Sequence, residues 1–257
     1  MNTILKIKGL KHNNLEISIS ENSISTISGA NNCGKTTLMK ILAKNIECES
    51  EIEYKGKKIS EIDVDEYNNL VKIIIPKAII FDENSIEEEL YNKCNFSYKE
   101  KEQIINYLIK NLKIKKDINK NINTLTTKEI ILAQIAIALV NKPSILLIDS
   151  IDLYFDLEEQ KKIVEVLRNY IEKYGLTVII TSSNLEISIE TDYLYIIDKG
   201  NLELEGKPLD VLKNDNVINK IGLNIPFMID LSVKLKDYDL IDNIELEYDR
   251  MIEALWK

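Results

Sequence analysis

The chain has 257 residues, of which 45% are apolar, enough for one large domain or a domain with a small appendage. Its formal net charge of -9 argues against a nucleic-acid partner, which would need a basic surface to neutralise phosphates. We expect no transmembrane helix and no signal peptide, because no apolar run reaches the ~20 residues that span a bilayer. The three cysteines, Cys33, Cys48 and Cys94, lack metal-ligand spacing and are expected to be reduced thiols.

Hydrophobic patterns predict the following elements in chain order. Strands are predicted at 3–8, 15–19 and 23–28, a helix at 37–44, a hairpin over 50–62 with Gly56 at its turn, and a strand at 71–75. Helices are predicted at 85–92, 98–116, 125–142 and 157–173, strands at 144–149 and 176–182, and a hairpin at 193–206 that turns at Lys199–Gly200. The tail, roughly 215–257, is predicted to be helical. Apolar strands that alternate with helices predict an α/β fold with a mostly parallel sheet and crossover helices.

The segment 29-GANNCGKT-36 fits the phosphate-loop pattern G-x-x-x-x-G-K-[ST] and lies between a predicted strand and a predicted helix. In such a loop, backbone N–H groups and the helix N-terminus cradle phosphate oxygens. We expect Lys35 to reach the β- and γ-phosphates, Thr36 to ligate Mg²⁺ and Thr37 to touch the α-phosphate. The predicted nucleotide-binding residues are Gly29, Ala30, Asn31, Asn32, Cys33, Gly34, Lys35, Thr36 and Thr37. The alternative, a chance match in a glycine-containing turn, explains neither flanking element.

One residue of this loop and one distant acid bear on the predicted site. Asn32 stands where many such loops have another glycine, and asparagine tolerates a positive φ better than most residues. Asp149 ends the apolar run "SILLID" and is the candidate second Mg²⁺ ligand; a solvated acid at a strand end is the alternative.

In this order, the motifs resemble those of an ABC-type ATPase over nearly the whole chain. "GANNCGKTTL" is similar to Walker A, "ILLID" to Walker B, and "IDLYFD", which ends at Asp156, to the D-loop. The tail is similar to the C-terminal helical extension of energy-coupling-factor ATPases, which serve vitamin and metal-ion importers. The resemblance implies a P-loop NTPase fold with an antiparallel β subdomain. It also implies a nucleotide-binding domain at 1–214, a helical subdomain at about 85–142 and an extension at 215–257.

Several positions depart from the family pattern. Pro76, followed by Lys77, replaces a glutamine, Ser150 replaces the glutamate after Walker B, and Ser183 replaces a histidine. The family signature LSGGQ reads Leu125-Thr126-Thr127-Lys128-Glu129. The one histidine, His12, lies near the place of an adenine-stacking aromatic residue, although a solvated strand-end residue is the simpler interpretation.

These losses predict a site that binds nucleotide but hydrolyses it weakly or not at all. A positioned general base contributes about 10²–10⁴-fold, and the Ser150 hydroxyl is not basic at neutral pH. The missing histidine removes a donor that would stabilise charge on the γ-phosphate. Whether the chain is an enzyme is therefore left open.

The resemblance also implies a head-to-tail dimer in which the signature segment caps the partner's nucleotide. Thr126 keeps a hydroxyl where the family has serine, and Thr126 with Glu129 fits a capping box. Lys128 is a candidate phosphate contact. The alternative is a well-capped helix with no nucleotide role.

The leading hypothesis is a degenerate ATP-binding subunit of an energy-coupling-factor-like importer of a vitamin or metal ion. It would use ATP and Mg²⁺ and pair with an active ATPase subunit, in a hetero- or homodimer. It would lie in the cytoplasm on the inner face of the cell membrane, with residues 76–89 against an integral membrane coupling protein. The alternatives are an ATP-sensing regulatory protein that dimerises on ATP and an active ATPase with Asp152 or Asp156 as base. A DNA-repair ABC protein, the fourth class, would need a long coiled-coil insertion that this sequence lacks.

Overall fold

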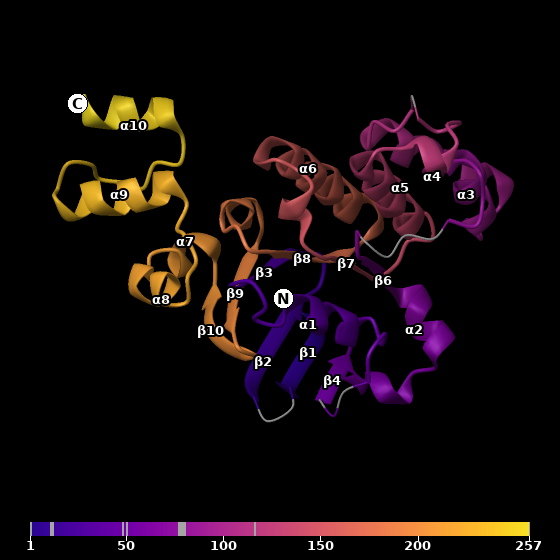
Figure 1. The fold of residues 1–257 in the computed structure, drawn as a ribbon, viewed down its shortest axis with the longest axis horizontal. Coiled ribbons are helices and arrows are strands. Elements are labelled where there is room, and N and C mark those ends of the chain that lie inside the picture. Colours follow the sequence, from indigo (N-terminus) through magenta and orange to yellow (C-terminus); the bar gives the residue numbers. More distant parts are fainter. Residues whose placement is uncertain are drawn as a thin grey trace.

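The computed structural model describes residues 2–10, 13–47, 49, 51–76, 81–115 and 117–256. These residues form an antiparallel sheet, a larger mixed sheet, helices on both faces of the larger sheet, and a C-terminal helical unit at one end (Figure 1).

The smaller sheet has the strand order β2-β1-β4-β5 and is antiparallel throughout. Its strands are β1 (Thr3–Leu10), β2 (Asn13–Ser20), β4 (Glu51–Tyr54) and β5 (Lys57–Lys58). Lys55 and Gly56 join β4 to β5 with φ values of 49° and 79°. Two successive left-handed residues make the turn that two-residue hairpins prefer. The predicted hairpin and antiparallel subdomain are confirmed.

The larger sheet has the order β10-β9-β3-β8-β7-β6, and only β10 runs antiparallel to its neighbour. Its strands are β3 (Ile24–Ser28), β6 (Val71–Ile74), β7 (Ile145–Ile148), β8 (Thr177–Ser182), β9 (Tyr193–Asp198) and β10 (Asn201–Gly206). The mostly parallel sheet is as predicted. The carboxyl ends of β3, β7 and β8 meet at one edge, where ligands of open α/β sheets bind.

Helices cover both faces of this sheet (Figure 1). One face packs on α1 (Lys35–Leu42) and the antiparallel sheet. The other packs on α5 (Thr127–Leu139) and α6 (Leu157–Tyr174), which contact α3 (Ile86–Lys93) and α4 (Tyr98–Asn111) in one continuous core. The buried Tyr170 hydroxyl donates a hydrogen bond to the Leu139 carbonyl at 2.6 Å, which ties α6 to the end of α5.

Three helices differ most from the sequence prediction, whereas α1 and α3 are shifted by one or two residues. Helix α4 ends at Asn111 instead of 116, because Lys113 adopts a left-handed φ of 59° and Ile114 N–H bonds back to the Ile109 carbonyl at 3.2 Å. Helix α5 is shorter than 125–142 at both ends. Helix α2 (Val64–Leu70) was not predicted; the Asp63 carboxylate caps it by accepting from the N–H groups of its first turn. Single 3₁₀ turns occur at Ile59–Glu61, Ile122–Thr124, Ile151–Leu153 and Glu186–Glu190.

The tail is helical, as predicted. Its helices are α8 (Asp215–Lys220), α9 (Phe227–Asp237) and α10 (Tyr248–Leu255), and the short helix α7 (Pro208–Val211) precedes it. Ile218 and Ile229 of this unit pack in one cluster with Leu194 and Ile196 of β9. This packing crosses the boundary at 214/215, and the division there remains a prediction.

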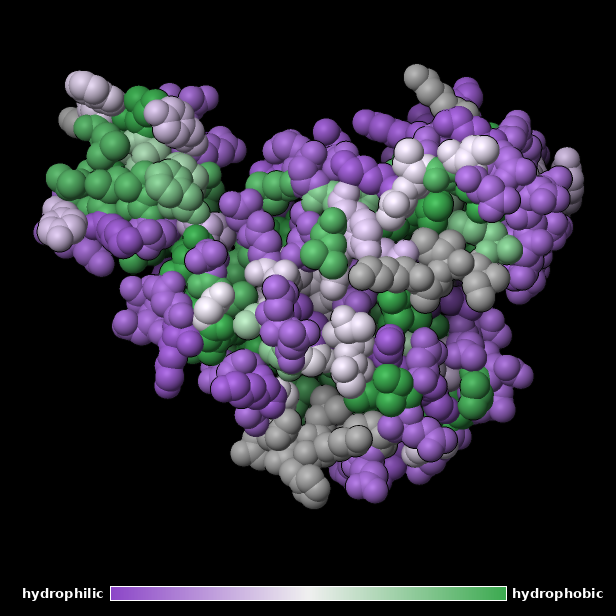
Figure 2. Space-filling view, viewed as in Figure 1, coloured by the Kyte–Doolittle hydropathy of each residue, from purple (hydrophilic) through white to green (hydrophobic). Residues whose placement is uncertain are grey.

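Apolar side chains gather on the surface of α9 and α10, seen as the green area at the upper left of Figure 2. The exposed large apolar residues of this unit are Phe227, Tyr238, Leu240, Leu246, Tyr248, Ile252, Leu255 and Trp256. Among the helices that the structure describes, none combines the length and apolarity that crossing a bilayer requires.

Candidate functional site

The phosphate loop connects β3 to α1 and has the backbone conformations that its glycines and asparagine permit. A Cβ at Gly29 would lie 2.3 Å from the Ile197 carbonyl oxygen and 2.5 Å from the Cys33 sulfur, so no larger residue fits there. Asn32 has a φ of 64° and Gly34 a φ of 109°. The expectation that Asn32 closes the loop through a left-handed conformation is confirmed.

The ammonium group of Lys35 lies inside the concavity of this loop. Lys35 is only 8% exposed, and its Nζ donates hydrogen bonds to the carbonyls of Gly29 at 2.5 Å and Ala30 at 3.0 Å. Its Nζ also lies 3.9 Å from the Cys33 sulfur. No carboxylate pairs with this buried ammonium within the described residues, which favours the approach of an anionic ligand. Cys33 is buried beside it and fills space against Gly29.

Thr36 and Asp149 meet at the carboxyl edge of the sheet. The Thr36 hydroxyl donates to Asp149 Oδ2 at 2.8 Å, and Thr181 of β8 donates to Asp149 Oδ1 at 2.6 Å. Hard oxygen ligands of this kind suit Mg²⁺, which commonly takes few protein ligands and completes its shell with phosphate and water. The described residues contain no group of three or more His, Cys, Asp or Glu that could hold a metal by itself. The site therefore fits Mg²⁺ bound together with a nucleotide.

A cavity of about 360 Å³ opens beside Thr36, and Asp149 is not among the residues that line it. Its lining residues are Asn31, Asn32, Gly34, Lys35, Thr36, Thr37, Ser150, Leu153 and Ser183. The structure thus brings the phosphate loop together with Ser150 and Ser183, two of the positions that depart from the family pattern. None of the described lining residues carries a carboxylate or an imidazole.

Ser150 directly follows Asp149 and lines the cavity. It has a left-handed φ of 53°, and its backbone N–H donates to the Thr181 hydroxyl at 2.8 Å. Thr181 thereby orients both Asp149 and the Ser150 backbone. The sequence did not predict this role of Thr181, because a uniformly buried strand gives no sign of which polar residue faces the site.

Ser183 is held by an acidic residue from the turn after β7. Asp152 Oδ2 accepts from the Ser183 backbone N–H at 3.0 Å and from its hydroxyl at 2.8 Å. Asp152 Oδ1 is buried and has no hydrogen-bond partner within the described structure. Asp152 does not line the cavity.

The remaining predicted residues lie elsewhere. Thr126 caps α5, Thr126 with Glu129 forms the predicted capping box, and neither residue lines the cavity at the phosphate loop. Lys128 bonds to both carboxylate oxygens of Glu159 at 2.7 and 2.5 Å, an ion pair that competes with the expected phosphate contact. Asp156 caps α6 through its own capping box with Glu159.

Pro76 is buried just after β6 and does not line the cavity. Three residues with a predicted role or state lie outside the described residues: His12, Lys77 and Cys48.

The fold and site define a P-loop NTPase with a phosphate loop, a Walker-type aspartate and crossover helices. The family described as "ABC transporter" matches residues 12–151. The chain therefore belongs to the ABC transporter family.

Individual relatives agree with this assignment. The spermidine/putrescine import ATP-binding protein PotA of Clostridium novyi is 29% identical over 216 residues, which are 81% of this chain but only 62% of PotA. The energy-coupling factor transporter ATP-binding protein EcfA1 of Mycoplasma genitalium is 27% identical over 252 residues, covering 95% of this chain and 90% of EcfA1. The structure of cbiO1 from Clostridium perfringens, part of the ABC transporter complex cbiONQ, superposes with a TM-score of 0.75 over 90% of this chain and 99% of cbiO1. At 21% identity, that likeness shows the fold.

Proposed function

We propose that this chain is a nucleotide clamp: the ATP-binding, hydrolytically impaired subunit of an energy-coupling-factor-like ABC importer. The observation that carries the proposal is the lining of the nucleotide cavity. It combines the phosphate loop with Ser150 and Ser183, and none of its described residues can act as a base.

In this proposal the site keeps the residues that bind nucleotide and lacks the residues that would catalyse its hydrolysis. Lys35 would exchange its hydrogen bonds to the loop carbonyls for hydrogen bonds to phosphate oxygens, whose negative charge would compensate that of the ammonium group. Thr36 and Asp149 would hold Mg²⁺, which would neutralise phosphate charge. The water that attacks the γ-phosphate would find only the Ser150 hydroxyl, and the expected loss from a missing base is about 10²–10⁴-fold.

A partner subunit supplies the other half of the proposed assembly. The signature segment starting at Thr126 does not line this chain's own nucleotide cavity, which fits a role on a partner's nucleotide. The exposed apolar residues of α9 and α10 fit a protein contact, because patches of this kind mark interaction surfaces. The names of EcfA1 and cbiO1 support a cytoplasmic position on the inner face of the membrane, beside a membrane coupling protein. A vitamin or metal ion is the proposed cargo class, carried by a separate membrane protein.

The other candidate is an ATP-sensing regulator that dimerises on ATP without any transporter. Affinity-tagged chain, recovered from detergent-solubilised membranes of the source cells with Mg-ATP present, separates the two. The clamp predicts a co-purifying integral membrane protein and a second ABC ATPase. Recovery of the chain alone or only with soluble partners would contradict the transport role. A Glu203→Gln variant, altered at an exposed position of β10 outside the cavity and outside α9 and α10, is the matched control.

A further inference from the structure

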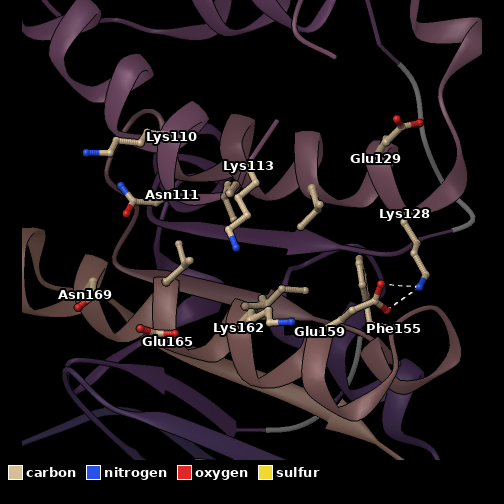
Figure 3. Close-up of a pocket in the computed structure, with 14 residues that line it drawn as sticks. Lys110, Asn111, Lys113, Lys128, Glu129, Phe155, Glu159, Lys162, Glu165 and Asn169 are labelled. Carbon is tan, nitrogen blue, oxygen red and sulfur yellow. Dashed lines mark hydrogen bonds and ion pairs between the residues drawn. The ribbon is translucent and has the colours of Figure 1, made fainter. Parts of the chain in front are cut away.

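A second cavity, of about 470 Å³, lies between α6 and the α4–α5 pair, away from the nucleotide site (Figure 3). Its floor is apolar and is formed by Leu112, Leu132, Phe155, Ile163 and Val166. Leu112, Phe155 and Ile163 are each no more than 5% exposed. The volume falls in the ~300–1,000 Å³ range of small-molecule sites.

The rim of this cavity carries unneutralised positive charge. Lys110, Lys113 and Lys162 line it, and none of the three makes an ion pair or side-chain hydrogen bond within the described part of the chain. Figure 3 shows Lys113 pointing from the end of α4 into the gap, with Lys162 on the opposite wall. Figure 3 shows Lys110 pointing away from the gap. Among the lining carboxylates, only that of Glu165 has no ion pair or side-chain hydrogen bond within the described residues.

The other charges of the rim are already satisfied. Lys128 pairs with Glu159 at 2.5 Å, and its Nζ lies 5.9 Å from the centre of the Phe155 ring, which closes one end of the cavity. Glu129 pairs with Lys120 at 3.3 Å. The excess of positive charge is therefore local, on a chain whose net charge is -9.

We propose that this cavity binds a small organic anion that has an apolar body and one carboxylate, phosphate or sulfonate head group. The body would displace water from the apolar floor, and the head group would lie between Lys113 and Lys162. A compact cavity suits such a molecule better than a peptide helix, which needs an extended groove. This inference does not rest on the proposed function.

A ligand in this cavity would contact the signature segment. Lys128 and Glu129, in the first turn of α5, line the cavity together with Phe155, the residue before Asp156 at the start of α6. A molecule bound here touches both helices near their N-termini and resists their separation. Its binding would therefore be linked to any movement of α5 against α6.

Fluorescence titration with 1-anilinonaphthalene-8-sulfonate, an anion with an aromatic body, tests the site. We expect one probe per chain, with affinity that falls as salt rises. Lys113→Gly and Lys162→Gln should each weaken binding about tenfold, the loss of one charge-assisted contact. Lys113→Gly should fold, because glycine favours the left-handed φ of 59° found there. Val166→Glu, which places a carboxylate in the cavity, should abolish binding.

Matched variants exclude other binding places. Lys99→Gln removes the same charge from an exposed position of α4 outside the cavity and should leave affinity unchanged. Unchanged affinity in Lys113→Gly and Val166→Glu would overturn the proposal, as would loss of binding in Leu255→Ser, which would place the probe on the extension. Displacement of the probe by excess Mg-ATP with no effect of Lys113→Gly would assign it to the nucleotide site and overturn the proposal too. Absence of any probe binding would do the same.

Discussion

Ser183 donates two hydrogen bonds to one carboxylate oxygen of Asp152, from its backbone N–H at 3.0 Å and from its hydroxyl at 2.8 Å. These bonds link the residue after β8 to the turn after β7, the two segments that border the nucleotide cavity. This oxygen of Asp152 therefore has a structural partner, whereas a catalytic base would need an oxygen that is free to accept a proton.

We expect Asp152→Ala to lower stability without changing ATP affinity. Loss of a charged acceptor for two hydrogen bonds costs about 2 kcal/mol, which urea denaturation measures as a lower midpoint. ATP affinity should stay within about twofold, because Asp152 does not line the cavity. If the wild-type chain hydrolyses ATP and Asp152→Ala alone abolishes that activity, Asp152 is the base and this assignment is wrong.

Thr36→Val should separate metal binding from phosphate binding. The variant keeps the backbone of the loop but removes the hydroxyl that lies 2.8 Å from Asp149. We expect calorimetry to show similar ATP affinity with and without Mg²⁺ in the variant, whereas the wild type binds more tightly with Mg²⁺. Thr37→Val is the matched control. A full Mg²⁺ effect in Thr36→Val would contradict the predicted ligand role.

Gly29 and Gly34 should respond differently to alanine. A Cβ at Gly29 would lie 2.3 Å from a backbone carbonyl oxygen, and overpacking against backbone costs about 3 kcal/mol or more. Gly34 has open space but a φ of 109°, so Gly34→Ala costs backbone strain of about 1–3 kcal/mol. Thermal denaturation should rank Gly29→Ala as the less stable variant, and the reverse order would contradict the close contact with Ile197.

The cap of α5 should persist in acid. Hydrogen bonds from the Thr126 N–H and hydroxyl, together with Lys120, lower the pKa of Glu129 from 4.5 to about 2. Because the pKa is lower in the folded chain, this stabilisation is complete above pH 4.5 and is lost as pH falls through about 2. Carboxyl-carbon NMR should show Glu129 titrating near the lower value.

Thr126→Val provides the control for this cap, because it removes the hydroxyl and keeps the backbone donor. The Glu129 pKa should rise in Thr126→Val and stay low in Thr127→Val, whose hydroxyl makes no bond to Glu129 in the structure. Titration of wild-type Glu129 near 4.5 would show that the capping box does not form.

Residue patterns predicted much of the fold and the central residues of the nucleotide site. The apolar run ending at Asp149 and the loop before Lys35 are local signals, and both elements lie where they were expected. The early end of α4 was not predictable, because nothing in the sequence marks Lys113 as left-handed. Thr181 and the second cavity were missed because they depend on which side chains of distant elements face each other.

The central claim is that this site binds ATP and leaves it intact. The most direct test mixes labelled Mg-ATP with excess purified chain and follows the label, with Lys35→Ala as control. We predict that the label stays bound as intact ATP in the wild type and is released by Lys35→Ala. Rapid formation of ADP by the wild type alone would show that another group replaces the missing base at Ser150.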